Sequence, residues 1–179
     1  TLPDGMCGLP GNRHIQAKYT VSKDATFRLD ITGDTDTTTL MSFANHSYWN
    51  LDGSPTYDGH QLRVAADHSL PVTPDYFPTG EVVAVEGTPM DFRKKRVVTP
   101  NQPPFDNNFC LSDHDEELRD VLTLCGTSGV QMTMATTASG IQIYDGRSPP
   151  RPGKQCYEGL AIEAQSWPDA PNNPAFPST

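Results

Sequence analysis

The sequence is poor in basic side chains. Its 179 residues include 13 Lys and Arg against 22 Asp and Glu, which gives a formal net charge of −9 at pH 7. Without a basic stripe to neutralise phosphates, neither nucleic acid nor an anionic membrane is an expected partner. No apolar run approaches the length of a transmembrane helix, and residues 1–12 do not have the form of a signal peptide.

Cysteine is also scarce, and its spacing excludes some kinds of site. The chain has four cysteines, and no two of them have the CxxC spacing of a zinc knuckle. A Ser/His/Asp set, a glycine-rich phosphate loop and a metal-ligand cluster with usable spacing are all missing. We therefore expect no metal and no cofactor, and four free thiols in a reducing setting, which indicates the cytoplasm. The four residues are Cys7, Cys110, Cys125 and Cys156.

Helical periodicity is nearly absent, whereas apolar and polar residues alternate in many short segments. The 17 prolines and 14 glycines punctuate these segments. Many short alternating strands predict an all-β, antiparallel fold, and their uneven lengths favour a sandwich over a barrel. No repeat or linker divides the sequence, so we predict a single domain over residues 1–179. Strands are expected near residues 15–21, 27–31, 37–51, 62–66, 82–85, 118–125, 129–137 (with Val130, Met132 and Met134 inward), 140–145 and 160–165.

Residues 43–51 (FANHSYWNL) place a titratable group, His46, among aromatic and hydrogen-bonding side chains. This combination suits a sugar, because sugar rings have apolar faces and a rim of hydroxyl groups. The alternative, which is commoner for a histidine taken alone, is a ring whose nitrogens are satisfied within the sheet.

Three further polar residues are candidates for the same site. Glu163 alternates with Leu160 and Ile162 along a strand, so its carboxylate faces away from the apolar side. Asp106 has aromatic residues on both flanks, and Gln142 shares a strand face with Tyr144. Each also has an ordinary interpretation: a solvated strand face for Glu163 and Gln142, and a turn for the Asp-Asn-Asn sequence that starts at Asp106. A carboxylate pair of the glycosidase type stays open, because such partners meet only in the fold.

Five stretches, taken in order along nearly the whole chain, resemble the aldose 1-epimerase (galactose mutarotase) family. Any one of these motifs is weak, but five in order are specific. They are residues 45–51 (NHSYWNL), 70–94 (LPVTPDYFPTGEVVAVEGTPMDFRK), 105–109 (FDNNF), 140–144 (GIQIY) and 162–177, which contains IEAQ, WPDAPN and FP.

The resemblance implies a galactose mutarotase-like supersandwich with a sugar in an open cleft on a concave sheet. It implies an isomerase that interconverts the α and β anomers of a free hexose such as galactose or glucose, without metal or cofactor. By the resemblance, His46 is the general acid that protonates the ring oxygen, and Glu163 is the general base at the anomeric hydroxyl. Asp106 and Gln142 would hold sugar hydroxyls.

The sequence also departs from the family. Asn107, Trp49 and Ala164 stand where His, Phe and Thr are common, and residues 146–155 are shorter than the family's loop. The family's N-terminal part, with a sugar-binding arginine and a second histidine, has no counterpart, and Arg13 does not match that arginine. We therefore expect a fragment of the family domain, incomplete at both ends, with the remainder as a partner.

Two other functions remain open at the level of the sequence. A non-catalytic carbohydrate-binding module could have kept the cleft and lost turnover. A glycoside hydrolase or lyase on a related sandwich would need a second carboxylate that faces Glu163 across a bound sugar.

Overall fold

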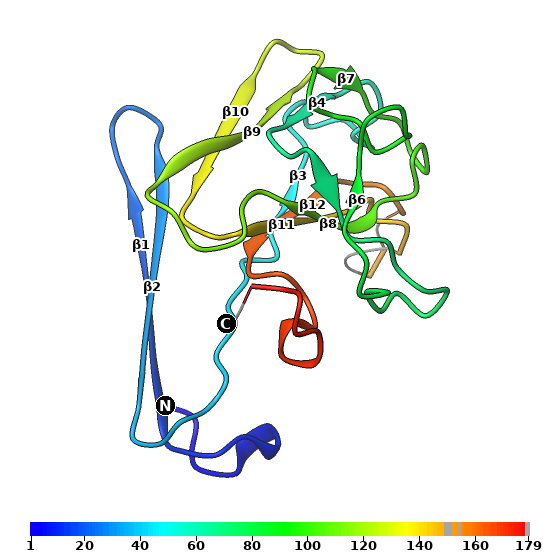
Figure 1. The fold of residues 1–179 in the computed structure, drawn as a ribbon. Helices are drawn as coiled ribbons and strands as arrows, with labels where there is room; N and C mark the ends of the chain where they lie inside the picture. Colours follow the sequence, from blue (N-terminus) through cyan, green and yellow to red (C-terminus); the bar gives the residue numbers. More distant parts are fainter. Residues whose placement is uncertain (149–151, 154, 178–179) are drawn as a thin grey trace. The chain divides into compact units, whose positions relative to one another are not determined.

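A computed structural model describes residues 1–148, 152–153 and 155–177 (Figure 1). The chain divides into two compact units, residues 1–43 and a second unit that begins at Ala44. That both belong to one domain stays a prediction. The helices of the described residues are two 3₁₀ turns, η1 (Met6–Gly8) and η2 (Ala170–Asn172). No helix in this part of the chain is long and apolar enough to cross a membrane.

The first unit is a long β-hairpin preceded by a loop. Strand β1 (Arg13–Val21) pairs antiparallel with β2 (Phe27–Thr35), in an unbroken register from Arg13 opposite Thr35 to Val21 opposite Phe27. The turn is closed by the amide of Ser22, which donates to the carbonyl of Thr26 at 3.0 Å. The predicted hairpin is thus confirmed, and its strands are longer than the alternation of apolar residues indicates.

One face of this hairpin is apolar. Residues directly opposite each other in an antiparallel pair project to the same side, so the register decides which side chains share a face. The polar residues of both strands meet on the other side. Several apolar side chains are well exposed: Tyr19 by 59%, Val21 by 77% and Phe27 by 49%. The pairs that share the apolar face are Ile15 and Gly33, Ala17 and Ile31, Tyr19 and Leu29, and Val21 and Phe27.

A strand face with several exposed apolar side chains favours association with another chain. We expect the protein to self-associate at micromolar concentrations, and the triple substitution Tyr19→Thr, Val21→Thr and Phe27→Thr to shift it toward monomer. Threonine retains β propensity, so the hairpin itself should persist. Light scattering measures the change. A monodisperse wild-type monomer, or a variant that associates as strongly as the wild type, would refute the expectation. Gln16→Thr with Arg28→Thr, on the polar face, is the matched control.

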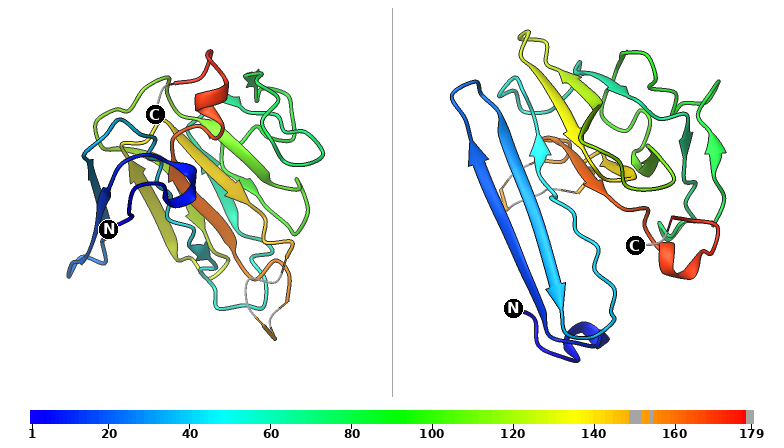
Figure 2. Two further views of the ribbon diagram at one scale, coloured as in Figure 1. Left: turned by 90° about the horizontal axis from the view of Figure 1, so that it is seen from below. Right: turned by 60° about the vertical axis from the view of Figure 1, so that its left-hand side comes forward.

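The second unit consists of two antiparallel sheets (Figures 1 and 2). One has four strands in the order β10-β9-β4-β7, and the other has six in the order β3-β12-β11-β8-β5-β6. The strands are β3 (Tyr48–Trp49), β4 (Gln61–Val64), β5 (His68–Ser69), β6 (Val83–Ala84), β7 (Arg96–Val97), β8 (Asp106–Cys110), β9 (Arg119–Cys125), β10 (Gln131–Thr136), β11 (Gly140–Tyr144) and β12 (Leu160–Gln165).

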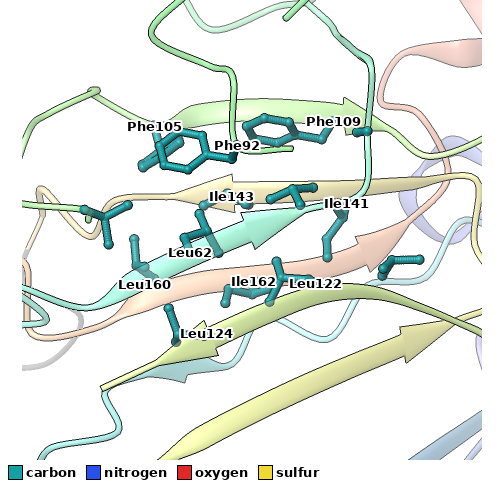
Figure 3. Packing of buried hydrophobic residues seen from close by; sticks show 14 of the residues in the cluster. Leu62, Phe92, Phe105, Phe109, Leu122, Leu124, Ile141, Ile143, Leu160 and Ile162 are labelled. Carbon is teal, nitrogen blue, oxygen red and sulfur yellow. The ribbon is translucent and has the colours of Figure 1, made fainter. Parts of the chain in front are cut away.

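The hydrophobic core lies where the two sheets face each other (Figure 3). Each buried leucine, isoleucine or phenylalanine side chain contributes about 1.5–3 kcal/mol relative to an exposed position. The predicted antiparallel β-sandwich is therefore confirmed. The four-stranded sheet contributes Leu62, Leu122 and Leu124, and the six-stranded sheet contributes Phe109, Ile141, Ile143, Leu160 and Ile162.

Three local predictions differ from the structure. The turn interpretation of the Asp-Asn-Asn sequence is wrong, because Asp106–Cys110 is strand β8, with β11 and β5 hydrogen-bonded on either side. These neighbours, together with buried Phe109, override the local turn preference. Val130 is 52% exposed rather than inward, because it precedes β10. Within the expected strand 37–51, only Tyr48–Trp49 pairs.

Candidate active site

A cavity of about 590 Å³ opens on the six-stranded sheet, which is a size typical of small-molecule sites. It is lined by residues of β8, β11 and β12 and by the connecting segments around them. His46, Asp106, Gln142 and Glu163 all belong to its lining. The other lining residues are Leu70, Val72, Tyr76, Pro78, Asn108, Tyr144, Arg147, Ser148, Gln165 and Pro168.

Strand register brings three of these side chains to one face. Gln142 on β11 lies directly opposite Glu163 on β12 and directly opposite Asn108 on β8. Asp106 precedes Asn108 by two residues, so it shares that face. The intervening residues, such as Ile162, project to the opposite side and fill the core. The same alternation therefore builds the core and the cavity floor.

His46 meets Glu163 inside the cavity. The Nε2 atom of His46 lies 3.3 Å from Oε1 of Glu163. The Glu163 side chain is only 10% exposed, whereas that of His46 is 54% exposed. The segment that carries His46 is held beside β12 by a hydrogen bond from the Ile162 amide to the Ser47 carbonyl, at 3.3 Å. A buried carboxylate is thus paired with an accessible imidazole.

The environment of Glu163 shifts its pKa. Burial raises the pKa of Glu163 and is the largest cause, because a charged carboxylate is costly to desolvate. The neighbouring His46 lowers that pKa, and the negative charge of Asp106 raises it. The result is a carboxylate that holds a proton more readily than an exposed glutamate and yet lies beside a group that can be cationic.

Asp106 and Gln142 form a second polar pair on the cavity floor. The Gln142 amide Nε2 donates to Oδ1 of Asp106 at 3.0 Å. Burial raises the pKa of Asp106, while the hydrogen bond from Gln142 and the charge of Arg147 act against that rise. This hydrogen bond holds both side chains in place, so that the cavity contains a carboxylate that can accept hydrogen bonds and an amide beside it.

Several lining residues were not predicted. Tyr144 follows Gln142 by two residues, so strand parity alone could have placed it in the cavity. Tyr48 does not line the cavity, but its ring packs against two residues that do, His46 with ring centroids 5.2 Å apart and Tyr144 at 6.4 Å. Tyr76 and Arg147 come from irregular segments, where no periodic signal marks them.

The other histidines and Arg13 lie outside this cavity. His60 is fully buried, and its Nε2 accepts a hydrogen bond from the Leu51 amide at 3.0 Å, which is a structural role. His14 and His114 are exposed, and His68 opens strand β5. Arg13 belongs to the first unit, where it is buried and donates to the Met6 carbonyl at 2.8 Å.

No disulfide joins the cysteines in the part of the chain that the structure describes. All four cysteines are free thiols, and burial raises the pKa of Cys110 to about 12. Within the described ranges, no three His, Cys, Asp or Glu residues are grouped so that they could hold a metal ion.

Comparison with known proteins identifies the family. The profile of the aldose 1-epimerase family matches residues 1–179. The chain belongs to this family. The match covers the whole sequence, including the segments that carry His46, Asp106, Gln142 and Glu163, and it confirms the resemblance seen in the motifs.

Relatives in the aldose 1-epimerase family are about twice as long. The chain is 34% identical to rat galactose mutarotase over 189 aligned positions, which cover 98% of this chain and 55% of that protein. It is 30% identical to aldose 1-epimerase of Haemophilus influenzae, over 97% of this chain and 56% of the relative. The chain thus spans about half the length of these relatives.

Solved structures agree with the family fold. An aldose epimerase homologue from C. elegans superposes with a TM-score of 0.88 at 27% identity, over 98% of this chain and 57% of that one. Galactose 1-epimerase from Lactobacillus acidophilus gives a TM-score of 0.78 at 24% identity, over 91% and 51%, and supports the fold alone.

Proposed function

We propose that this protein is an aldose 1-epimerase that interconverts the α and β anomers of a free hexose such as galactose or glucose. The observation that carries the proposal is the contact between His46 and Glu163, 3.3 Å apart in a cavity large enough for a sugar. Family membership supports the same reaction.

The spacing of this pair suits the chemistry. Anomerisation requires a proton on the ring oxygen and the loss of a proton from the anomeric hydroxyl. Both oxygens are bonded to the same carbon, C1, so the proton donor and acceptor must lie side by side rather than across the ring. His46 and Glu163 do lie side by side, and a sugar above them can meet both.

The proposed reaction runs in two balanced halves. Glu163 takes the proton of the anomeric hydroxyl while His46 donates a proton to the ring oxygen, and the bond between C1 and the ring oxygen breaks to give the open-chain aldehyde. Rotation about C1–C2 exposes the other face of the carbonyl. Closure then returns both protons, with His46 as base and Glu163 as acid. Both groups end in their starting states, so the cycle consumes no co-reactant.

The electrostatics support these roles. A general base works best when its pKa lies near the working pH. Burial moves the pKa of Glu163 upward, in that direction, and His46 acts against this rise by favouring the ionised carboxylate, which is the form that accepts a proton. The rate should fall as pH drops through the raised pKa of Glu163, because protonated Glu163 is no longer a base.

The remaining polar groups are proposed to bind the substrate. Asp106 and Gln142 offer a carboxylate oxygen and an amide to the sugar hydroxyls, while Tyr144 offers ring surface to the apolar face of the sugar. The four free thiols support a reducing compartment, and we propose the cytoplasm.

Polarimetry tests the proposed function. The full chain is mixed with freshly dissolved α-galactose or α-glucose, and the change in optical rotation is followed beyond the spontaneous rate. An accelerated approach to the anomeric equilibrium is expected. Sugar binding in calorimetry without any acceleration would instead indicate a non-catalytic carbohydrate-binding module and refute the enzyme.

Asp106→Asn is expected to affect substrate binding more than turnover. Asparagine can still accept the Gln142 hydrogen bond and contact a sugar hydroxyl, but it lacks the charge, so KM should rise about tenfold with little change in kcat. Because the charge of Asp106 raises the pKa of Glu163, the acid limb of the kcat profile should also move to lower pH. Steady-state polarimetry at several pH values measures both.

A lower kcat at unchanged KM would contradict this role for Asp106. The control is Asp113→Asn, because Asp113 is also an aspartate with a polar side-chain partner, His114, but does not line the cavity. This control should leave KM, kcat and the pH profile unaltered.

A further inference from the structure

Arg147 lines the cavity on the segment that follows β11, and its guanidinium is held from three sides. Its Nε donates to Oδ1 of Asp145 at 2.9 Å, its Nη2 to the carbonyl of Phe105 at 2.5 Å, and its Nη1 to the hydroxyl of Tyr76 at 2.9 Å. These three partners come from three separate segments of the chain, so one side chain joins them at the rim of the cavity.

Two tyrosine rings also pack against the guanidinium of Arg147. The guanidinium carbon lies 5.3 Å from the ring centroid of Tyr76 and 5.4 Å from that of Tyr144, within the range of cation–π attraction. The Arg147 side chain is 23% exposed, and its partner Asp145 is fully buried. A buried carboxylate therefore anchors a cation that still reaches the cavity.

The loop that carries Tyr76 is joined to this anchor through the Tyr76 side chain. Tyr76 lies between Val72 and Pro78, which form an isolated β-bridge, and Tyr76 itself is 55% exposed. The ring contact and the hydroxyl bond to Arg147 are both made by its side chain. Three residues of this loop, Val72, Tyr76 and Pro78, line the cavity, so fixing the loop fixes a wall of the site.

We propose that Arg147 is a positioning residue for the sugar, which fastens the Tyr76 loop to the end of β11 and places a fixed positive charge beside Asp106. The inference rests on the proposed function, because the sugar is the substrate whose binding Arg147 would organise. Arg147 contacts no reacting atom in this account. It acts indirectly, by holding the Tyr76 loop that forms part of the cavity wall. Its charge also acts on Asp106, the carboxylate proposed to accept a hydrogen bond from a sugar hydroxyl.

The charge of Arg147 bears directly on Asp106. The charged and polar groups that act on the carboxylate of Asp106 are Gln142, Arg147, Asp145 and His46, and Glu163 lies two strands away on β12. Of these, Gln142 favours the ionised carboxylate through its hydrogen bond, Arg147 and His46 favour it through their charge, and Asp145 opposes it. Since burial raises the pKa of Asp106, the cation helps to keep it a charged acceptor at neutral pH.

The test compares two variants that differ only at Arg147. Removing Arg147 alone would leave the buried Asp145 carboxylate without its ion-pair partner and could unfold the protein. Both variants therefore carry Asp145→Asn, one with Arg147 retained and one with Arg147→Gln. Thermal melts of the full chain first establish that both are folded.

We expect the additional Arg147→Gln change to raise KM for galactose or glucose about tenfold in polarimetric kinetics and to change kcat by less than about threefold, as fits the loss of a charge-assisted anchor.

Arg96→Gln is the matched control. Arg96 also lies over an aromatic ring, Phe92 at 4.7 Å, and donates to backbone carbonyls, but it does not line the cavity. Equal KM values in the two variants that carry Asp145→Asn would overturn the inference.

A second readout does not depend on turnover. The pKa of Asp106, followed by carboxyl-carbon NMR in the same two variants, should be higher in the variant with Arg147→Gln. An unchanged pKa would overturn the inference even if the enzyme is active. Absence of mutarotation in the wild-type protein would refute the proposed function instead, and the NMR titration would still decide whether Arg147 acts on Asp106.

Discussion

Replacing Glu163 by glutamine is expected to lower kcat about 10²–10⁴-fold, the range for loss of a general acid–base group. Glutamine keeps the shape of the side chain and one hydrogen bond in its 10% exposed setting, but its amide does not accept a proton at neutral pH. Substrate binding should survive, so KM should change little. Polarimetric kinetics on the full chain measures both constants.

The Glu163 result is interpretable only against a matched control. Glu116→Gln serves this purpose, because Glu116 is also an ion-paired glutamate, 3.0 Å from Arg119, and does not line the cavity. It should leave kcat unaltered. A Glu163→Gln enzyme that keeps its kcat while KM rises would show that Glu163 only binds the sugar, and the acid–base roles would have to be assigned to other residues.

Replacing His46 by asparagine is expected to cost a similar 10²–10⁴-fold in kcat, about what one proton-transfer group contributes. An amide can occupy the same space beside Glu163 but does not protonate a ring oxygen. The double variant His46→Asn with Glu163→Gln should be little worse than either single one, because the two groups act together in each half of the reaction.

His114→Asn is the control for this prediction. His114 is also an exposed histidine against a carboxylate, that of Asp113 at 2.5 Å, but it lies outside the cavity. It should retain full activity. Full activity in His46→Asn would contradict the role of His46 as the proton donor. Additive losses in the double variant would contradict the paired mechanism.

Much of the fold could be predicted because strand periodicity is a local property. Leu160 and Ile162 alternate with Glu163, and this parity alone indicates which side chains fill the core and which face away from it. The same holds for Gln142, which alternates with Ile141 and Ile143. Tertiary contacts do not change this alternation. Successive side chains of a strand point to opposite faces of the sheet, whichever strands pair with it.

The parts that could not be predicted depend on contacts between distant segments. Residues 106–108 (Asp-Asn-Asn) have turn composition, and the neighbouring strands β5 and β11 make them part of strand β8. Arg147 and Tyr76 meet across the cavity rim from irregular segments, for which no periodicity exists. Nothing in the spacing of His46 and Glu163 along the chain fixes their separation in space. The resemblance to the family, rather than the residue pattern, suggested that pair.

The central claim is that the anomeric centre of a hexose lies over the pair formed by His46 and Glu163. The most direct measurement is a crystal structure of the full chain carrying Glu163→Gln, which should bind substrate without converting it, with galactose or glucose bound. The account predicts that the anomeric oxygen lies within about 3 Å of the residue 163 side chain and the ring oxygen within about 3 Å of Nε2 of His46, with other hydroxyls on Asp106 and Gln142. A sugar bound elsewhere, or one whose reducing end points away from His46 and residue 163, would contradict it.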